Sequence, residues 1–298
     1  MRRKRKKNKT LAAIAVLLAL CLLAGLSIVG TVKKRAADAR EAEIAEQKAA
    51  EAAAQEEEAK QKEETAKKSE RIFAYRGSSE DGLYTMASYE NAVEAGAGTI
   101  VVPFVVSQDG TLFVADDDYA QELTGYGGYF SGMVDSQIDN LETKSGTKVL
   151  KVSEVFDKFG TDVKYVLDLR YTSERNQEAL RKFLEENGNE DVISVACNYF
   201  SGLRALESSL PDVTKIFMCQ DEASYNEARF ADYVDTISVN KDMMSEELCK
   251  GAHEYDKKFS AWSLNSAEDV KKAIDIGADS FFTDEVAVAV EAEGGSEE

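Results

Sequence analysis

Histidine is nearly absent from this chain of 298 residues, which has only His253. That residue lies in the helix-like stretch SEELCKGAHEYDKKF rather than at the end of a strand-like run. Histidine is the side chain whose unperturbed pKa lets it accept and release a proton near neutral pH. The sequence therefore excludes a mechanism in which two histidines act as acid and base, and we expect His253 to be a surface or packing residue.

Cysteine is also scarce. Of the four cysteines, Cys21 lies in an apolar run near the N-terminus, and Cys197, Cys219 and Cys249 follow much later at wide spacing. An odd number at such spacing excludes a disulfide framework, and the spacing suits no zinc site. Two of the three lie in strand-like apolar runs, so we expect buried free thiols.

Positive charge is in short supply. The chain has 36 Lys and Arg against 55 Asp and Glu, a formal net charge of −19. Seven of the 36 Lys and Arg are in the first ten residues, which contain no acid, so the part that follows is more acidic than the average suggests. Such a chain is repelled by nucleic acids and by anionic lipid surfaces, which excludes nucleic acid as a partner.

The N-terminus has the pattern of a membrane anchor. Residues 1–10 (MRRKRKKNKT) form a basic segment, and residues 11–32 contain no charged residue. A run of that length spans a hydrocarbon core of about 30 Å as a helix. The positive-inside rule places the basic end in the cytoplasm. We therefore expect a single-pass cell-membrane protein, typical of a bacterial surface, whose remainder is extracytoplasmic. A cleaved signal peptide has a shorter apolar core and is the alternative.

Residues 33–70 are rich in Ala, Glu, Lys and Gln and contain neither Gly nor Pro. That composition favours a helix, and pairs such as Glu56 with Lys60 and Glu63 with Lys67 have the favourable i,i+4 spacing. Ile44 is the only large apolar residue of the segment, which argues against a coiled coil. We predict a solvated helical stalk.

The segment 71–288 alternates short β-branched or aromatic runs with amphipathic helical runs, and an acidic tail, 289–298, predicted to be disordered, follows it. Eight strands with intervening helices at this length predict an α/β fold, a (β/α)₈ TIM barrel, as one domain. Residues 107–150 interrupt the alternation, and we interpret them as an insertion over the barrel mouth. The predicted strands cover residues 71–75, 99–106, 163–169, 192–197, 214–219, 234–239, 258–263 and 280–283.

Four segments carry a resemblance to a known family. In order, they read IFAYRG, AVEAGAGTIVVPFVVSQDGTLFVADDD, YVLDLR and AWSLNSAEDVKKAIDIGADSFFTDE. Together they resemble the glycerophosphodiester phosphodiesterase family of TIM barrels, over nearly all of residues 71–288. The resemblance implies metal-assisted cleavage of a phosphodiester, in which one histidine activates the nucleophile, another protonates the leaving group, and Ca²⁺ or Mg²⁺ gathers the oxygens.

The sequence departs from the family at its catalytic positions. Where the family has His-Arg-Gly at the end of its first strand, this chain has Tyr75, Arg76 and Gly77. The second catalytic histidine aligns with Asp116. A phenol with a pKa near 10 is seldom ionised at neutral pH, and an aspartate is a weak base unless burial raises its pKa. Efficient family chemistry is therefore not expected.

The metal positions are replaced as well. The family's Glu-x-Asp pair of ligands aligns with Val101 and Pro103, and its third carboxylate aligns with Asp168. Valine offers no lone pair to a hard cation. We therefore expect no cofactor, with Ca²⁺ or Mg²⁺ only where the family site is partly retained. A rebuilt metal cluster of Asp168 with Asp116, Asp117 and Asp118 is an alternative, although adjacent acids are more typical of a solvated surface.

Other family positions are kept or conservatively replaced. The resemblance marks Arg76 and Arg170 as phosphate-binding residues, since guanidinium groups grip phosphate oxygens in pairs. An ion pair of Arg76 with Asp168 or Asp116 is the structural alternative. Trp262 is a candidate to line a ligand site or to pack in the barrel mouth. Asp284, in the family's closing Thr-Asp pair, is expected to order a loop.

These observations predict a membrane-anchored barrel that has lost efficient catalysis and binds a small phosphodiester ligand or an envelope protein. The alternative is a phosphodiester hydrolase of lipid metabolism with weak or altered chemistry that uses Arg76, Asp116 and Asp168.

Overall fold

The computed structural model describes residue 48 and residues 70–76, 82–188 and 190–294. The predicted basic segment, membrane span and stalk lie outside these residues except for residues 48 and 70. Within the described ranges, no helix is both long and apolar enough to cross a membrane.

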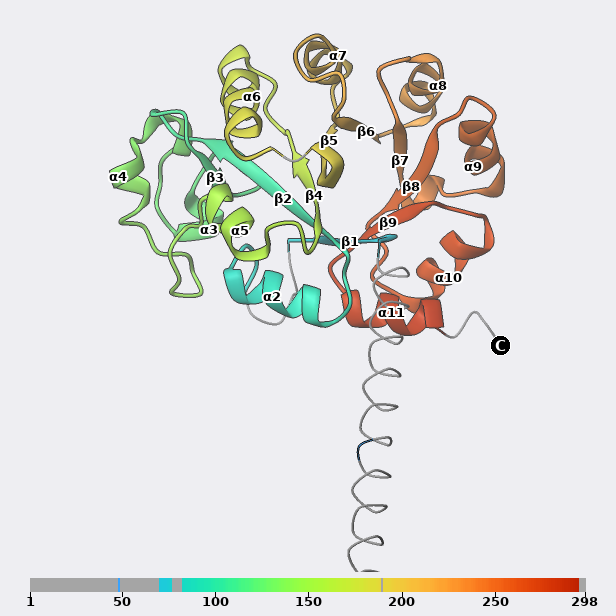
Figure 1. The fold of residues 1–298 in the computed structure, drawn as a ribbon, viewed down its shortest axis with the longest axis horizontal. Coiled ribbons are helices and arrows are strands. Elements are labelled where there is room, and N and C mark those ends of the chain that lie inside the picture. Colours follow the sequence, from blue (N-terminus) through green and yellow to red (C-terminus); the bar gives the residue numbers. More distant parts are fainter. Residues whose placement is uncertain (1–47, 49–69, 77–81, 189, 295–298) are drawn as a thin grey trace, which may run out of the picture. The chain divides into compact units, whose positions relative to one another are not determined.

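Eight parallel strands form the centre of the fold (Figure 1). Their hydrogen bonding runs from β1 through β9, β8, β7, β6, β5 and β4 to β2, and β2 pairs with β1 again. The sheet is therefore a closed barrel, as predicted. The eight strands are β1 (Ile72–Tyr75), β2 (Thr99–Val106), β4 (Lys164–Asp168), β5 (Ile193–Cys197), β6 (Thr214–Cys219), β7 (Thr236–Asn240), β8 (Lys258–Trp262) and β9 (Ser280–Thr283).

The observed strands agree with the predicted ones to within two residues. Short runs of β-branched and aromatic residues between helical runs are sufficient for this, because most strand residues are buried and the strands are therefore dense apolar runs. The outward-facing residues pack against the helices in the main hydrophobic cluster, which includes Ile100, Leu167, Ile237 and Phe281.

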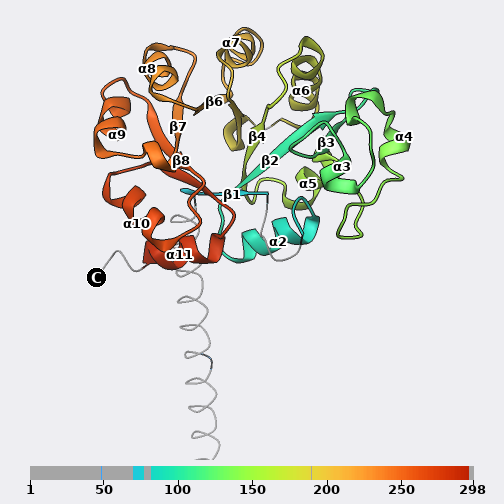
Figure 2. The same cartoon turned by 180° about the vertical axis from the view of Figure 1, so that it is seen from behind.

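Helices surround the barrel, as both views show (Figures 1 and 2). Several begin at a side chain that accepts a hydrogen bond from the first turn, such as Ser173, Asp221, Ser245 and Ser266. The helices are α2 (Met86–Glu94), α3 (Gln121–Thr124), α4 (Asp135–Ile138), α5 (Val152–Phe159), α6 (Glu174–Asn187), α7 (Phe200–Ser209), α8 (Glu222–Phe230), α9 (Glu246–His253), α10 (Ala267–Asp275) and α11 (Val286–Gly294). Short 3₁₀ helices cover Phe130–Gly132, Glu190–Val192 and Lys241–Met243.

The last helix corrects one prediction. Residues 289–294 were expected to belong to a disordered acidic tail, but α11 continues through Gly294. The reason is burial, since Ala289 and Ala292 are 0% and 6% exposed. Residues 295–298 lie outside the described residues.

The insertion is a small folded unit beside β2. Its strand β3 (Leu112–Val114) pairs antiparallel with β2. Val105 of β2 belongs to a separate hydrophobic cluster with Phe113, Phe130 and Ile138. The elements β3, α3 and α4 gather near β2 in Figure 1. From this unit, Asp116 and Asp117 reach the barrel mouth.

Inside the barrel, a compact apolar layer supports the mouth. Val101, Val166, Ile216 and Phe282 form a buried cluster within the ring of strands. Phe73 packs edge-on against Phe282, with ring centroids 5.1 Å apart. This layer fixes the floor on which the strand-end side chains lie.

The cysteine prediction is confirmed for the described residues. Cys197, Cys219 and Cys249 are buried free thiols. Burial raises the pKa of Cys197 and Cys249 to about 11 and that of Cys219 to about 12, so all three are poor nucleophiles at neutral pH.

Truncation of the barrel floor should be costly. Phe282 is 2% exposed, and Phe282→Ala should lower the free energy of unfolding by about 3–5 kcal/mol because it leaves a cavity under the mouth. Urea unfolding measures the loss. Phe230→Ala is the matched control, since Phe230 is 65% exposed and its loss should stay within about 0.5 kcal/mol. Equal losses for the two variants would contradict the assignment of the floor.

Candidate ligand site at the barrel mouth

A cavity of about 480 Å³ opens at the carboxyl ends of the strands. Residues of six strands line it, namely Tyr75 of β1, Asp168 of β4, Ala196 of β5, Met218 of β6, Trp262 of β8 and Phe282 of β9. Ligand sites of (β/α)₈ barrels form at this rim. The volume falls within the range of about 300–1,000 Å³ that small-molecule sites occupy.

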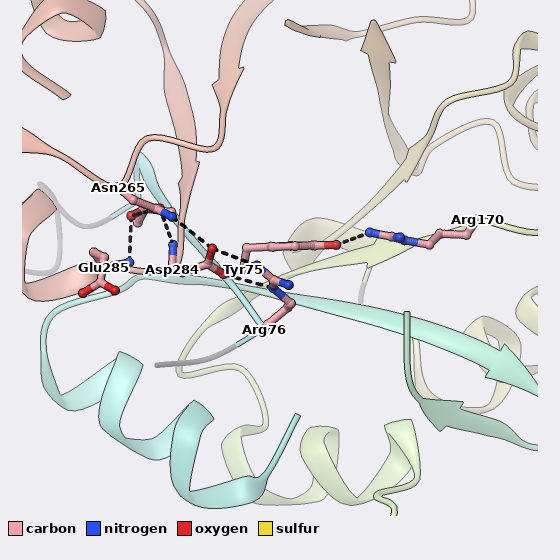
Figure 3. Close-up of polar contacts among 7 residues, drawn as sticks. Tyr75, Arg76, Arg170, Asn265, Asp284 and Glu285 are labelled. Carbon is pink, nitrogen blue, oxygen red and sulfur yellow. Dashed lines mark hydrogen bonds and ion pairs between the residues drawn. The ribbon is translucent and has the colours of Figure 1, made fainter. Parts of the chain in front are cut away.

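A polar chain crosses one side of the cavity. Arg170 donates from Nε to Asp168 Oδ2 over 2.9 Å and from Nη2 to the hydroxyl oxygen of Tyr75. Figure 3 shows Tyr75 extended toward Arg170. The strand-end carboxylate is thereby neutralised by an arginine two residues further along the chain.

The same surroundings change the pKa values of Tyr75 and Asp168. Burial and the nearby charges of Asp168 and Asp116 raise the pKa of Tyr75 above its usual value. Tyr75 is therefore a neutral phenol at physiological pH and cannot act as a base. Burial raises the pKa of Asp168, against the opposing effect of Arg170.

Arg76 makes a different contact from the ones predicted. Its Nε and Nη2 donate to the two carboxylate oxygens of Asp284 over 3.1 and 2.9 Å. The prediction of an ion pair with Asp168 or Asp116 was wrong, because closure of the barrel brings the end of β9 beside the end of β1. At Arg76 φ is 62°, a left-handed conformation that a non-glycine residue keeps when surrounding contacts hold it.

Asn265 completes this cluster, which Figure 3 draws. Its Nδ2 donates to Asp284 Oδ2 over 3.2 Å, and its Oδ1 accepts from the backbone N–H of Asp284 over 3.0 Å. Thr283 Oγ1 also donates to Asn265 Oδ1 over 3.2 Å. Asp284 therefore orders the loop after β9, as its sequence position suggested, and at the same time holds Arg76.

The three adjacent acids of the insertion have separate roles. Asp118 accepts from the backbone N–H and the hydroxyl of Ser131, a contact within the insertion. Asp117 accepts from the Tyr171 hydroxyl over 3.2 Å. Asp116 lines the cavity, and its charge is one cause of the raised pKa of Tyr84, after burial. Among the described residues, no ion pair within 4.0 Å reaches Asp116 or Asp117.

Aromatic side chains form much of the cavity wall. Tyr171 and Trp262 line it from the β4 and β8 ends, and Tyr75 and Phe282 line it from β1 and β9. Tyr171 is anchored by its hydroxyl, which accepts from the backbone N–H of Asp118 over 3.1 Å. The wall therefore combines rigidly held rings with carboxylates.

The residues present do not fit a divalent metal ion. The side chain of Val101 has no ligand atom, and its carbonyl oxygen accepts from the Tyr89 hydroxyl over 3.4 Å. The carbonyl oxygen of Pro103 accepts from the backbone N–H of Ala115 over 3.2 Å. Asp168 is paired with Arg170. Within the described part of the chain, no group of three or more His, Cys, Asp or Glu side chains is arranged to hold a metal. The suggested cluster of Asp168 with Asp116, Asp117 and Asp118 is therefore not formed.

The structure brings most of the predicted site residues together. Tyr75, Asp116, Asp168, Arg170 and Trp262 all line the one cavity. Arg76 belongs instead to the adjacent cluster with Asp284. His253, the lone histidine, pairs with Asp279 over 2.8 Å, away from the carboxyl ends of the strands.

Sequence reasoning missed Tyr171 and Phe282 as lining residues and Asn265 as the partner of Asp284. A signal was available for two of them. Phe282 has the inward register of β9, and Tyr171 directly follows the Asp-Leu-Arg strand end.

The closed parallel barrel defines the chain as a (β/α)₈-barrel protein with a cavity at the carboxyl ends of its strands. Its family follows from comparison with known proteins. The profile of the Glycerophosphoryl diester phosphodiesterase family matches residues 76–288. The chain belongs to this family.

Two relatives match most of the chain at low identity. A glycerophosphodiester phosphodiesterase of Caldanaerobacter subterraneus subsp. tengcongensis is 25% identical over 230 residues, which cover 72% of this chain and 93% of that protein. An uncharacterized Bacillus subtilis protein is 25% identical over 236 residues, 72% of this chain and 94% of its own length.

Solved structures share the fold at lower identity. A phosphodiesterase of Oleispira antarctica in complex with the product sn-glycerol-3-phosphate superposes with a TM-score of 0.70 at 16% identity, covering 77% of this chain and 99% of that chain. A glycerophosphodiester phosphodiesterase of Thermotoga maritima gives a TM-score of 0.64 at 17% identity, covering 74% and 97%.

The bidentate contact of Arg76 with Asp284 should be strongly coupled. Asp284 is 9% exposed, so Asp284→Asn should lower the free energy of unfolding by about 1–3 kcal/mol by leaving a guanidinium without its counter-charge. Arg76→Met should cost a similar amount, and the double variant should cost less than the sum. Urea unfolding of all four proteins gives the coupling. The exposed pair Glu246 and Lys250 is the control and should show far weaker coupling, whereas strict additivity for Arg76 and Asp284 would contradict this result.

Proposed function

We propose that this protein is a membrane-anchored, extracytoplasmic member of the family that binds a ligand or protein at the barrel mouth and has lost efficient hydrolysis. The observation that carries the proposal is the pairing of charged side chains at the strand ends. The polar groups there neutralise one another, through Arg170 with Asp168 and Arg76 with Asp284.

Loss of the acid and base is the first support. Tyr75 stands at the position of one family histidine, and its neutral phenol accepts a hydrogen bond from Arg170. Asp116 stands at the other. Each missing acid or base removes about 10²–10⁴-fold of rate.

Loss of the metal-binding oxygens is the second support. Family chemistry uses a divalent ion to gather phosphate and nucleophile oxygens, and Val101 and Pro103 provide no free ligand atom here. An arginine at the strand end can neutralise Asp168, but it cannot lower the pKa of a bound water or hydroxyl as a metal does.

For the ligand, a small phosphodiester is one candidate and an envelope protein is the other. Arg170 lines the mouth cavity and is the cation that could contact a phosphate there, and Arg76 lies in the adjacent cluster. The product complex of the Oleispira antarctica protein supports a glycerol phosphate fragment as one probe for this barrel.

A hydrolase with altered chemistry is the second candidate function. It would use Arg76, Asp116 and Asp168. One observation favours it: Asp116 lines the cavity and has no ion-pair partner within 4.0 Å among the described residues.

A hydrolysis assay separates these two functions. The full-length chain in maltoside detergent should cleave glycerophosphocholine with Ca²⁺ or Mg²⁺ at least about 10⁴-fold more slowly than an active family enzyme assayed in parallel. Release of glycerol 3-phosphate measures the rate. With glycerophosphoglycerol as a second substrate, which carries no cation for Asp116 to attract, Asp116→Asn should leave any residual rate unchanged. Turnover at ordinary enzyme rates would overturn the proposal, and a residual rate lost in Asp116→Asn would favour the altered hydrolase.

The membrane arrangement is tested separately. If residues 11–32 are an uncleaved anchor, the protein should stay with the membrane after alkaline carbonate extraction, and external protease should digest the barrel in intact cells stripped of their wall. A chain lacking residues 1–32 is the control and should be released by extraction. Recovery of the full-length chain in the soluble fraction would contradict the anchor, and protection of the barrel from protease would contradict its external location.

A further inference from the structure

The cavity at the barrel mouth has an excess of negative charge. Within the described part of the chain, its charged lining consists of the acids Asp116, Asp117 and Asp168 and the base Arg170. Arg170 is committed to Asp168 by an ion pair of 2.9 Å. Asp116 and Asp117 are left without a counter-cation, so the field in the cavity favours a positively charged ligand.

The walls indicate what kind of cation fits. Trp262, Tyr171 and Phe282 line the cavity, together with the thioether of Met218. Aromatic faces attract cations through the ring quadrupole, and the attraction is greatest for organic ammonium groups that shed water easily. A small hard cation needs several oxygen ligands at about 2.0–2.6 Å, an arrangement that these residues do not form.

The carboxylates are placed to act at a distance rather than as ligands. Asp117 accepts from the Tyr171 hydroxyl over 3.2 Å and from the backbone N–H of Tyr119 over 2.9 Å. Asp168 accepts from Arg170. A bulky cation needs a diffuse negative field of this kind, because its methyl groups keep the charge away from any single oxygen.

The Tyr75 ring is not available to a ligand cation. The guanidinium of Arg76 lies over the Tyr75 ring, with Cζ 4.8 Å from its centroid, and Arg170 lies 6.0 Å from the same ring. That ring is already occupied by protein cations. Trp262 and Tyr171 also line the cavity and carry no such contact among the described residues, so they are the rings left to meet a ligand cation.

We infer that the cavity binds a quaternary ammonium ion, held by Trp262 and Tyr171 and by the field of Asp116 and Asp117. The inference deepens the proposed binding function and rests on it. It reverses the expectation that the mouth recognises its ligand through phosphate. Trimethylammonium groups occur on free choline and on phosphodiesters derived from lipid head groups, and both share this chemistry.

Calorimetry with the full-length chain in maltoside detergent tests the inference. Choline should bind at least about tenfold more tightly than 3,3-dimethyl-1-butanol, its neutral analogue of the same shape, because only choline gains the cation–π and charge contributions. Glycerophosphocholine serves as the second ligand. Equal affinity for glycerophosphocholine and choline would identify the free cation as the ligand. Tighter binding of glycerophosphocholine would identify a head-group phosphodiester. Both outcomes support the site.

Variants assign the binding to named residues. Trp262→Leu keeps an apolar side chain without the ring face and should weaken choline binding about 5- to 30-fold, while Trp262→Phe should retain most of it. Asp116→Asn should weaken it at least about fivefold. Phe230→Ala and Asp212→Asn, at exposed residues outside the cavity lining, are the matched controls and should leave choline affinity unchanged.

Two results would overturn the inference. One is equal affinity for choline and its neutral analogue, and the other is binding of glycerol 3-phosphate without binding of choline. A different result, rapid hydrolysis of glycerophosphocholine, would contradict the proposed loss of catalysis. Choline itself has no phosphodiester to cleave, so its binding is measured independently of any turnover.

Discussion

The pairing of β1 with both β2 and β9 is the constraint on which the rest of the structure depends. Phe73 lies opposite Thr99 on one side and Phe282 on the other, and these two contacts close the sheet into a barrel. Closure brings the first and last strand ends of the domain together. The cluster of Arg76, Asn265 and Asp284 exists because of this contact, since its members are far apart in the sequence.

Charge at the mouth is balanced by neighbours that the same closure provides. Arg76 neutralises Asp284 across the seam, and Arg170 neutralises Asp168 within its own strand end. Tyr75 lies between the two guanidinium groups, accepting a hydrogen bond from one and stacking under the other. The insertion then adds Asp116 and Asp117, which no ion pair among the described residues balances, so the surplus charge of the mouth comes from a segment outside the barrel repeat.

The barrel could be predicted from sequence because its signal is local. Each strand is a dense apolar run between polar or helical stretches. Strand limits such as Thr99–Val106 and Ser280–Thr283 therefore follow from where each apolar run begins and ends. The partners of Arg76 could not be predicted in this way. Several carboxylates lay at equivalent strand ends, and only the order of strands around the ring selects Asp284. The prediction of a disordered tail from residue 289 failed for a related reason. Burial of Ala289 and Ala292 in α11 depends on neighbouring elements that the composition of the segment does not reveal.

The internal ion pairs also explain why the site would be hard to return to family chemistry. Restoring histidine at residues 75 and 116 would supply an acid and a base but no metal. Restoring carboxylates at Val101 and Pro103 would place two more negative charges beside Asp168, whose only close counter-charge among the described residues is Arg170. Without a metal, that cluster of acids would repel itself in a partly buried site. The residues at the metal positions and the presence of a metal are therefore coupled through electrostatics. Carboxylates at residues 101 and 103 would be tolerated only together with the metal that neutralises them.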